Sequence, residues 1–366
     1  MTGPEKLVLQ RQLEERFGSN EELGYLPSNF IEIVNGLPRL IDRRVISYYP
    51  ELQNREYLIR ELSVPHSSYP IFAFQVVAGA FSRNIYVKFA PIYPQKNEGL
   101  VEYENLCLID EQFPKGQEYG SPKPLEFIAD LNALVMEGVE GIAFRKILLR
   151  NNWLGAWPAP RSVLKAIVQR CGRWLRDFHR INGIECTSIE TPLKSSMLLT
   201  WQRIKPGFSD SQLALQVQKI IESRPAVSVM PGSRKHGDLA LDNILVDKKS
   251  INVLDVSYTD RDVIYRDVAF FVANLRTINN LPFHLFFDFG YARQLCGDFL
   301  SAYGISEFLD GNATLQFYVI EAILGRFESQ ANTIKAKLGS ASGDFLVRYL
   351  CRKYSRILGE VVEDYS

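Results

Sequence analysis

The sequence lacks three features that would mark large classes of protein: long apolar runs, paired cysteines and an excess of one charge. No stretch reaches the about 18 apolar residues that a membrane-spanning helix needs, and residues 1–6 are polar, unlike the start of a signal peptide. The five cysteines are scattered, odd in number and without a C-x-x-C pair. This distribution argues against a disulfide framework or a zinc site and predicts reduced thiols. We therefore expect a cytoplasmic location.

Charge is balanced over the whole chain. Lys and Arg total 42 residues and Asp and Glu also total 42, so the formal net charge is zero. Nothing global favours a nucleic acid or a membrane surface as a partner. Hydrophobic residues make up 46% and charged residues 23% of the 366 residues, which is an ordinary globular composition in a chain long enough for two lobes. The oligomeric state is left open.

The first part of the chain changes its period at about residue 46. Residues 1–45 are interpreted as an N-terminal extension, with a short amphipathic helix over 5–17. The pattern then alternates as in an antiparallel meander, and a helix and a connector precede one more strand. The predicted segments are strands over 46–49, 57–64, 71–78 and 85–90, a helix over 98–112, a Pro/Gly-rich connector over 113–128 and a strand over 131–135. Residues 46–136 are therefore expected to form a sheet-rich N-lobe.

Lys88 lies inside one of these apolar strands. Such a lysine is either an edge residue that extends to water, or a residue that grips the phosphates of a nucleotide. The second interpretation needs a glutamate from the following helix. Glu102 lies on the same helical face as Leu106, four residues later, and Glu104 is the alternative on a different face.

An extended segment at 137–141 follows the last strand of the N-lobe and is expected to be a hinge. In an extended chain, alternate residues present their backbone groups on one side. The backbone groups of Glu137 and Val139 can therefore bond the edge of an adenine. The alternative is an ordinary surface loop.

From residue 142 to 366 the period becomes mostly that of helices, so we expect a helical C-lobe and an α+β fold of two lobes. Residues 258–266 are polar and irregular. The predicted helices cover 161–179, 194–204, 211–223, 267–279, 285–303, 313–333 and 342–363.

One stretch of the C-lobe combines polar residues at fixed offsets with two short apolar runs. His236-Gly237-Asp238 is followed after four residues by Asn243. The runs 244–246 and 251–254 predict a hairpin around the turn 247–250, and Asp255 comes directly after it. A loop before the first strand and a carboxylate after the second can bring Asp238, Asn243 and Asp255 to one point.

These residue types suit phosphoryl transfer, which needs positioning, charge neutralisation and metal ions. Asp238 can accept the proton of an acceptor hydroxyl. Asn243 and Asp255 offer the oxygen ligands that Mg²⁺ prefers. His236 is expected to brace the loop. Either half of this pattern alone is common, and only the whole constellation is specific.

The stretch resembles the catalytic loop and metal-binding strand end of the aminoglycoside phosphotransferase and choline kinase family, relatives of the protein kinases. Further resemblance lies in residues 134–141, in the helix 172–179 and in Arg266-Asp267-Val268-Ala269, whose aspartate is structural in the family. The resemblance covers roughly residues 50–330. It implies a protein-kinase-like fold, ATP or GTP as donor, Mg²⁺ as cofactor and a small molecule with a hydroxyl group as acceptor.

The sequence departs from the family and from its protein-kinase relatives in two places. Gly237 replaces the arginine of the protein-kinase template, and no D-F-G or A-P-E string occurs, which favours a small-molecule acceptor over a protein. The loop 65–70, where the phosphate-covering loop belongs, has no glycine. Ser67 and Ser68 are expected to donate hydrogen bonds there instead. The alternative function is a non-catalytic, nucleotide- or partner-binding member of the same fold.

The acceptor stays open between cationic and neutral or anionic molecules, because the region after the catalytic loop carries both charges. The acidic candidates are Asp260, Asp262, Glu321 and Glu328, and the basic ones are Arg261, Arg266, Arg276 and Arg326.

Overall fold

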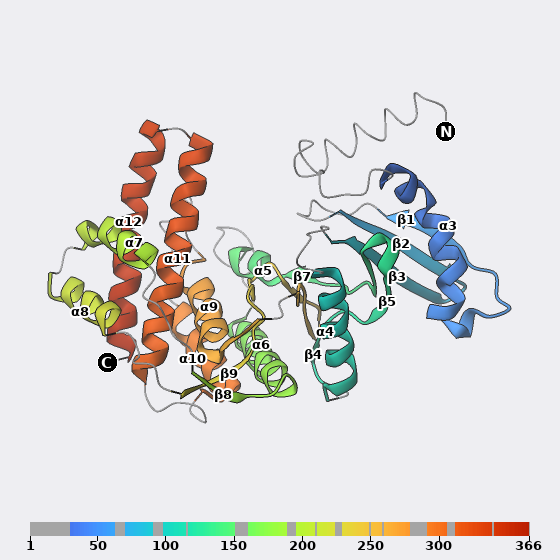
Figure 1. Cartoon of the computed structure of the whole chain (residues 1–366), viewed down its shortest axis with the longest axis horizontal. Helices are drawn as coiled ribbons and strands as arrows, with labels where there is room; N and C mark the ends of the chain where they lie inside the picture. The colour runs from blue at the N-terminus through green and yellow to red at the C-terminus, as the bar shows by residue number, and fades with distance from the viewer. Residues whose placement is uncertain are drawn as a thin grey trace. The chain divides into compact units, whose positions relative to one another are not determined.

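The structure is a computed structural model (Figure 1), and it describes most of the chain from Phe30 to Tyr365. The described residues are 30–62, 70–90, 98–114, 116–150, 160–188, 195–208, 211–223, 229–248, 250–257, 260–278, 291–305, 312–338 and 340–365. They fall into two compact units. Unit 1 comprises the part up to Phe113, Ser121–Glu140 and Asp255–Tyr258, and unit 2 comprises Pro114–Gly120, Gly141–Leu254 and the part from Thr259 onward. The predicted helix over 5–17 lies outside the described residues.

Unit 1 is built on a five-stranded sheet in the order β1-β2-β3-β6-β5, in which every neighbouring pair is antiparallel. The strands are β1 (Leu58–Leu62), β2 (Ile71–Ala78), β3 (Phe81–Phe89), β5 (Pro124–Ile128) and β6 (Ala133–Glu137), and helix α4 covers Glu98–Gln112. The predicted meander and the predicted helix are confirmed. The predicted connector over 113–128 is wrong in part, because β5 and the two-residue strand β4 (Tyr119–Gly120) lie within it.

Helix α3 (Phe30–Tyr48) covers part of this sheet, and the strand predicted over 46–49 is wrong. Leu37, Ile41 and Val45 recur every four residues on one helical face, and all three are buried in the same apolar cluster as β2, β3 and β6. Gly36 and Pro38 lie inside the helix, and these two residue types usually interrupt helices. This punctuation is why the sequence alone did not indicate a helix there.

Unit 2 contains the other α-helices of the described residues and two small sheets. The sheet order β4-β11-β10-β7 includes the predicted hairpin, whose strands β10 (Ile244–Val246) and β11 (Ile251–Val253) pair antiparallel with Ile244 opposite Val253. The second sheet has the order β12-β9-β8. The other strands are β7 (Ile142–Ala143), β8 (Glu185–Ser188), β9 (Val229–Arg234) and β12 (Arg261–Val263). The predicted irregular stretch over 258–266 is wrong in part, because β12 lies within it.

Seven helices of unit 2 follow the predicted order, with ends that differ by a few residues where the structure describes them, and α5 (Phe144–Arg150) was not predicted. The seven are α6 (Arg161–Ile181), α7 (Ser195–Ile204), α8 (Ser211–Glu222), α9 (Ile264–Arg276), α10 (Ala292–Tyr303), α11 (Asn312–Leu338) and α12 (Ser340–Tyr365). None of the helices in the described part of the chain is long and apolar enough to cross a membrane. The sheet-rich first part and the helical second part confirm the predicted α+β class.

Helix α6 lies tightly against α10, and Gly172 makes this approach possible. A Cβ atom on Gly172 would lie 2.5 Å from the carbonyl oxygen of Phe299, closer than side chains tolerate. Trp174 and Phe178, on the same helix, are fully buried and stack on each other. This packing fixes the end of α6, where His179 is also buried.

Candidate active site

Lys88 lies in β3, between β2 and β6, and therefore in the interior of the sheet rather than at its edge. Its Nζ donates a hydrogen bond of 2.8 Å to Oε2 of Glu102 on α4. Both residues are about 95% buried, with exposed fractions of 5% and 4%. Glu104, the alternative partner, is exposed to solvent. The structure thus brings Lys88 together with Glu102.

Asp255 is the second carboxylate on Lys88, with 2.5 Å between Nζ and Oδ1. Its backbone has φ of +59°, a left-handed conformation that is uncommon for a residue with a side chain. The next carbonyl, that of Val256, accepts a hydrogen bond from the side-chain amide of Asn105 on α4. Two side chains of unit 1 therefore hold the segment that carries Asp255.

The charge of Lys88 is maintained by these two carboxylates. Burial alone would lower the pKa of Lys88, but the charges of Glu102 and Asp255 outweigh it and raise the pKa above its ordinary value. Burial raises the pKa of Glu102, and Lys88 opposes that shift. The ammonium group of Lys88 therefore stays protonated although it is buried, and it can bind an anion.

The segment expected to bond an adenine follows β6. The backbone N–H of Glu137 donates to the carbonyl of Lys123 at 2.8 Å, and the N–H of Gly138 donates to the carbonyl of Asn84 at 2.6 Å. The N–H of Glu137 is therefore already used within unit 1, which narrows the predicted contact to its carbonyl and to the backbone of Val139. Ser67 and Ser68 lie outside the described residues.

The loop before β10 is anchored on Asp267, a fully buried carboxylate at the start of α9. Its two oxygens accept the backbone N–H groups of His236 at 2.7 Å and Gly237 at 2.9 Å. Gly237 has φ of +78°, a conformation that glycine adopts without strain. His179 lies 3.1 Å from Asp267 through Nε2 and 2.8 Å from the hydroxyl of Tyr303 through Nδ1.

This environment keeps Asp267 ionised. Burial alone would raise the pKa of Asp267, but the hydrogen bond from His179, the nearby His236 and the backbone N–H of Gly237 lower it below its ordinary value. A carboxylate with several donors is a rigid anchor for the loop backbone. Asp267 therefore fixes the backbone of His236 and Gly237.

His236 connects the loop to the far end of the hairpin. Its Nε2 lies 3.1 Å from the carbonyl oxygen of Leu254, and its Nδ1 accepts the backbone N–H of Asp238 at 3.3 Å. The ring is fully buried and lies edge-on to Trp174 and Phe178. With one nitrogen donating and the other accepting, the neutral imidazole matches both contacts. His236 braces the backbone on which Asp238 lies.

Asp238 and Asn243 are brought together inside the loop. The amide nitrogen of Asn243 donates to the backbone oxygen of Asp238 at 3.0 Å and to its carboxylate Oδ2 at 3.1 Å. The backbone N–H of Leu254 donates to the carbonyl of Asn243 at 2.8 Å, so the residue before Asp255 is tied to the same loop. The carboxylate of Asp238 is thus oriented by a neutral amide and is only partly buried.

The donor set fits a Mg²⁺ ion. Asn243 uses its amide nitrogen for Asp238, which leaves the amide oxygen for a ligand, and Asp255 offers a carboxylate. Among the described residues, no group of three or more His, Cys, Asp and Glu side chains is arranged to hold a metal ion. Mg²⁺ is commonly bound through one or two protein oxygens plus substrate phosphates.

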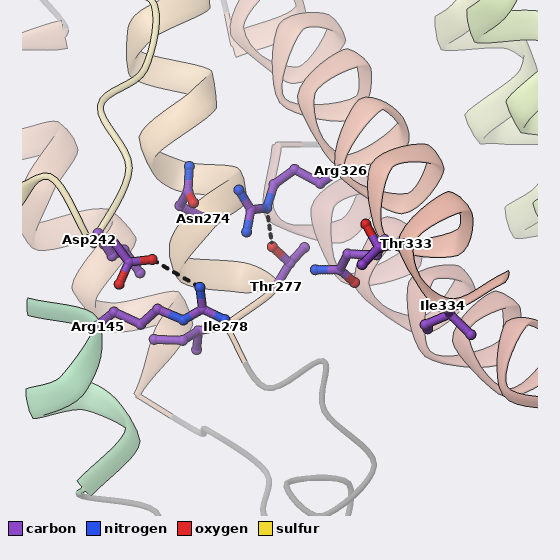
Figure 2. Close-up of a pocket in the computed structure, with 10 residues that line it drawn as sticks. Arg145, Asp242, Asn274, Thr277, Ile278, Arg326, Thr333 and Ile334 are labelled. Carbon is purple, nitrogen blue, oxygen red and sulfur yellow. Dashed lines mark hydrogen bonds and ion pairs between the residues drawn. The ribbon is translucent and has the colours of Figure 1, made fainter. Parts of the chain in front are cut away.

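Unit 2 also contains a cavity of about 220 Å³ next to the catalytic loop (Figure 2). It is lined by the loop, by α5, by the end of α9 and by α11. Its described lining residues are Arg145, Leu241, Asp242, Asn274, Thr277, Ile278, Arg326, Gln330, Thr333 and Ile334. Of these, the sequence analysis had singled out Arg326 alone, as one of four basic candidates.

The acidic candidates for a cationic acceptor are not among these lining residues, and each has another partner. Asp262 and Glu321 both pair with Arg266. Asp260 pairs with Lys235, and Glu328 accepts a hydrogen bond from Thr200. The polar lining residues come from helices that are far apart in the sequence. They could have been identified only by predicting that α9 contacts α11.

Comparisons with known proteins show what the chain is similar to. The model of a phosphotransferase enzyme family matches residues 114–299. No curated protein matches the chain at a significant level.

A glucosamine kinase structure is 14% identical, covers 86% of this chain and 84% of its own, and has a TM-score of 0.50. A choline kinase from Cryptosporidium parvum Iowa II is 11% identical, with coverage of 89% and 96% and a TM-score of 0.49. Spectinomycin phosphotransferase, solved with ADP and spectinomycin, is 13% identical, with coverage of 89% and 98% and a TM-score of 0.47. The predicted protein-kinase-like fold is confirmed.

Proposed function

The chain belongs to the phosphotransferase enzyme family, and on that premise we propose that it transfers the γ-phosphate of ATP or GTP to a hydroxyl group of a small molecule. The observation that carries this proposal is the geometry of the catalytic loop. The carboxylate of Asp238 is held by the Asn243 amide, in a loop whose backbone is anchored on Asp267. No cation pairs with Asp238 among the described residues, so its oxygens are available for a proton.

Asp238 is the general base of the proposed reaction. Its carboxylate accepts the proton of the acceptor hydroxyl while that oxygen forms a bond to the γ-phosphorus. The bond between the γ-phosphorus and the bridging oxygen breaks, and the nucleoside diphosphate leaves with the electron pair. Asp242, four residues later, is a poorer candidate because it pairs with Arg145 at 2.9 Å.

Nucleotide binding is assigned to groups of unit 1. Lys88, oriented by Glu102, donates to phosphate oxygens. The carbonyl of Glu137 and the backbone of Val139 bond the adenine or guanine edge, and Ser67 and Ser68 donate to the phosphates. Asn243 and Asp255 would each offer an oxygen ligand to Mg²⁺, which would neutralise the negative charge of the phosphates.

A screen of hydroxyl compounds with both ATP and GTP tests the proposal. The purified full chain should release ADP or GDP in stoichiometric amounts with a phosphorylated acceptor, detected by ³¹P NMR and mass spectrometry. Removal of Mg²⁺ with the chelator EDTA should stop the transfer of phosphate. A chain that binds nucleotide with Lys88 but gives no transfer to any acceptor or to water would instead favour the non-catalytic member of the fold.

A further inference from the structure

We propose that the acceptor carries an oxyanion, a carboxylate or a phosphate monoester, which binds Arg326 in the cavity beside the catalytic loop. This inference rests on the proposed function and names the chemical class of its acceptor. The inference is based on the guanidinium of Arg326 in the cavity wall and on the chemistry of the residues around this group (Figure 2).

The cavity lies where an acceptor must bind. Leu241 and Asp242, three and four residues after Asp238, form part of its wall. The charges of Asp238 and Asp242 both act to raise the pKa of Arg326, although burial lowers it by more. All of these residues belong to unit 2. A molecule in this cavity can therefore present a hydroxyl to Asp238 while another part of it contacts Arg326.

Arg326 is held in a fixed orientation. Its Nε donates a hydrogen bond of 2.8 Å to the hydroxyl of Thr277, and that hydroxyl donates at 2.7 Å to the carbonyl of Ala273. Figure 2 shows the guanidinium between Asn274 and Thr277. With Nε used, the two terminal nitrogens remain, and such a pair can bind the two oxygens of a carboxylate or phosphate.

Arg326 differs from the two partly buried arginines nearby on α9 because it has no carboxylate partner among the described residues. Arg276 pairs with Asp364 and Glu360, and Arg266 pairs with Asp262 and Glu321.

The pKa shifts of these arginines follow the same division. Burial would lower the pKa of Arg266, but its carboxylates raise it. Burial lowers the pKa of Arg326, and the weaker charge effects do not reverse this. A desolvated guanidinium without a counter-ion is costly, and a bound anion would remove that cost.

The rest of the described lining disfavours a cationic acceptor. The single carboxylate, Asp242, is already paired with Arg145, so the lining has two arginines against one aspartate. The other polar groups are neutral. Gln330 accepts the hydroxyl of Tyr354 through its amide oxygen, which leaves its amide nitrogen for a hydroxyl or an anion. An amine here would meet positive charge without a free carboxylate.

A matched series of acceptors tests the inference. Glucuronate, glucose 6-phosphate, glucose and glucosamine share one ring and differ in charge, and glycerate, glycerol 3-phosphate and glycerol form a second set. Two measurements are made on the full chain: kcat/KM for phosphate transfer, and equilibrium binding of each compound by calorimetry without nucleotide. The variants are Arg326→Gln, Arg326→Lys and the exposed control Arg348→Gln on α12.

We expect at least one anionic member to be preferred by about tenfold or more over its neutral and amine counterparts. Arg326→Gln should remove that preference, Arg326→Lys should restore part of it and Arg348→Gln should leave it unchanged. The carboxylate and phosphate arms show which oxyanion is bound.

Several results would overturn the inference. These are a preference for glucosamine or for the neutral members, or an anionic preference that survives Arg326→Gln. A protein that transfers phosphate to water but neither binds nor phosphorylates any anionic member also contradicts it. Failure of the proposed function looks different: anions bind in an Arg326-dependent way, but no phosphate is transferred to any acceptor or to water.

Discussion

The ammonium of Lys88 and the carboxylate of Glu102 form a buried ion pair in the interior of unit 1, with 2.8 Å between Nζ and Oε2. Their side chains are exposed by only 6% and 5%. Burying two charges costs free energy, and their mutual attraction offsets this cost only when the geometry is good. The presence of a buried ion pair is therefore weak evidence that it serves to stabilise the fold. Its position beside Asp255 agrees with a role in binding phosphates.

Removing one member of this pair should destabilise the protein strongly. Lys88→Met leaves Glu102 buried without its partner, and we expect a loss of about 3–5 kcal/mol in the free energy of unfolding, measured by urea denaturation. The double variant Lys88→Met/Glu102→Leu should recover much of the loss, because no charge is then left buried next to α4. Nucleotide affinity should be weak in both. A double variant no more stable than Lys88→Met would contradict this account of the pair.

Acid should weaken the anchor of the catalytic loop. The pKa of Asp267 in the folded state lies below its ordinary value of 3.8, so its contribution to stability is present above that value and is lost as pH falls through the lower folded pKa. Asp267→Asn should therefore be less stable than the native chain at pH 7, and the difference should narrow below pH 3.8. Urea denaturation from pH 7 to 3 measures this, with the exposed Asp247→Asn as control. A difference that stays constant over the series would show that the charge of Asp267 does not matter.

The turn at Gly237 should not tolerate a side chain. Gly237→Ala places a Cβ atom on a backbone with φ of +78°, which costs about 1–2 kcal/mol. It should also lower kcat, because His236 and Asp238 flank the turn. The matched control is Gly297→Ala on α10, where a Cβ atom would meet nothing within 4 Å. Unchanged stability and unchanged kcat in Gly237→Ala would show that the loop does not depend on this conformation.

The approach of α6 and α10 depends on Gly172. Gly172→Ala places a Cβ atom against the carbonyl of Phe299, and the backbone must move because a carbonyl cannot turn away. We expect a destabilisation of about 1–3 kcal/mol, as for other overpacked interiors, and a shift in the melting temperature. The same control on α10, Gly297→Ala, should raise stability or leave it unchanged. Equal melting temperatures for Gly172→Ala and the native chain would contradict the tight contact.

Features that depend on local pattern could be predicted from the sequence. The hairpin around 247–250, the strand with Lys88 and the face of α4 with Glu102 are all matters of period and turn chemistry. Helix α3 was missed because Gly36 and Pro38 interrupt the helical pattern.

The cavity lined by Arg326 could not be predicted from the sequence for a different reason. The sequence does not distinguish Arg326 from Arg276. Only the tertiary structure shows that Arg276 has carboxylate partners and that Arg326 lines the cavity. The assignment of Glu137 is narrowed for the same reason, since its N–H is taken by Lys123 from a neighbouring segment.

The central claim is that Asp238 accepts the proton of an acceptor hydroxyl, and the comparison of Asp238→Asn with Asp247→Asn tests it most directly. The two variants lose the same charge on either side of β10 and keep a side chain of the same shape. With the best acceptor from the screen, the account predicts that Asp238→Asn lowers kcat by about 10²- to 10⁴-fold and leaves nucleotide affinity and the melting temperature near native values. Asp247→Asn should have native kcat. Native kcat in Asp238→Asn, with the same acceptor and full nucleotide occupancy, would contradict the account.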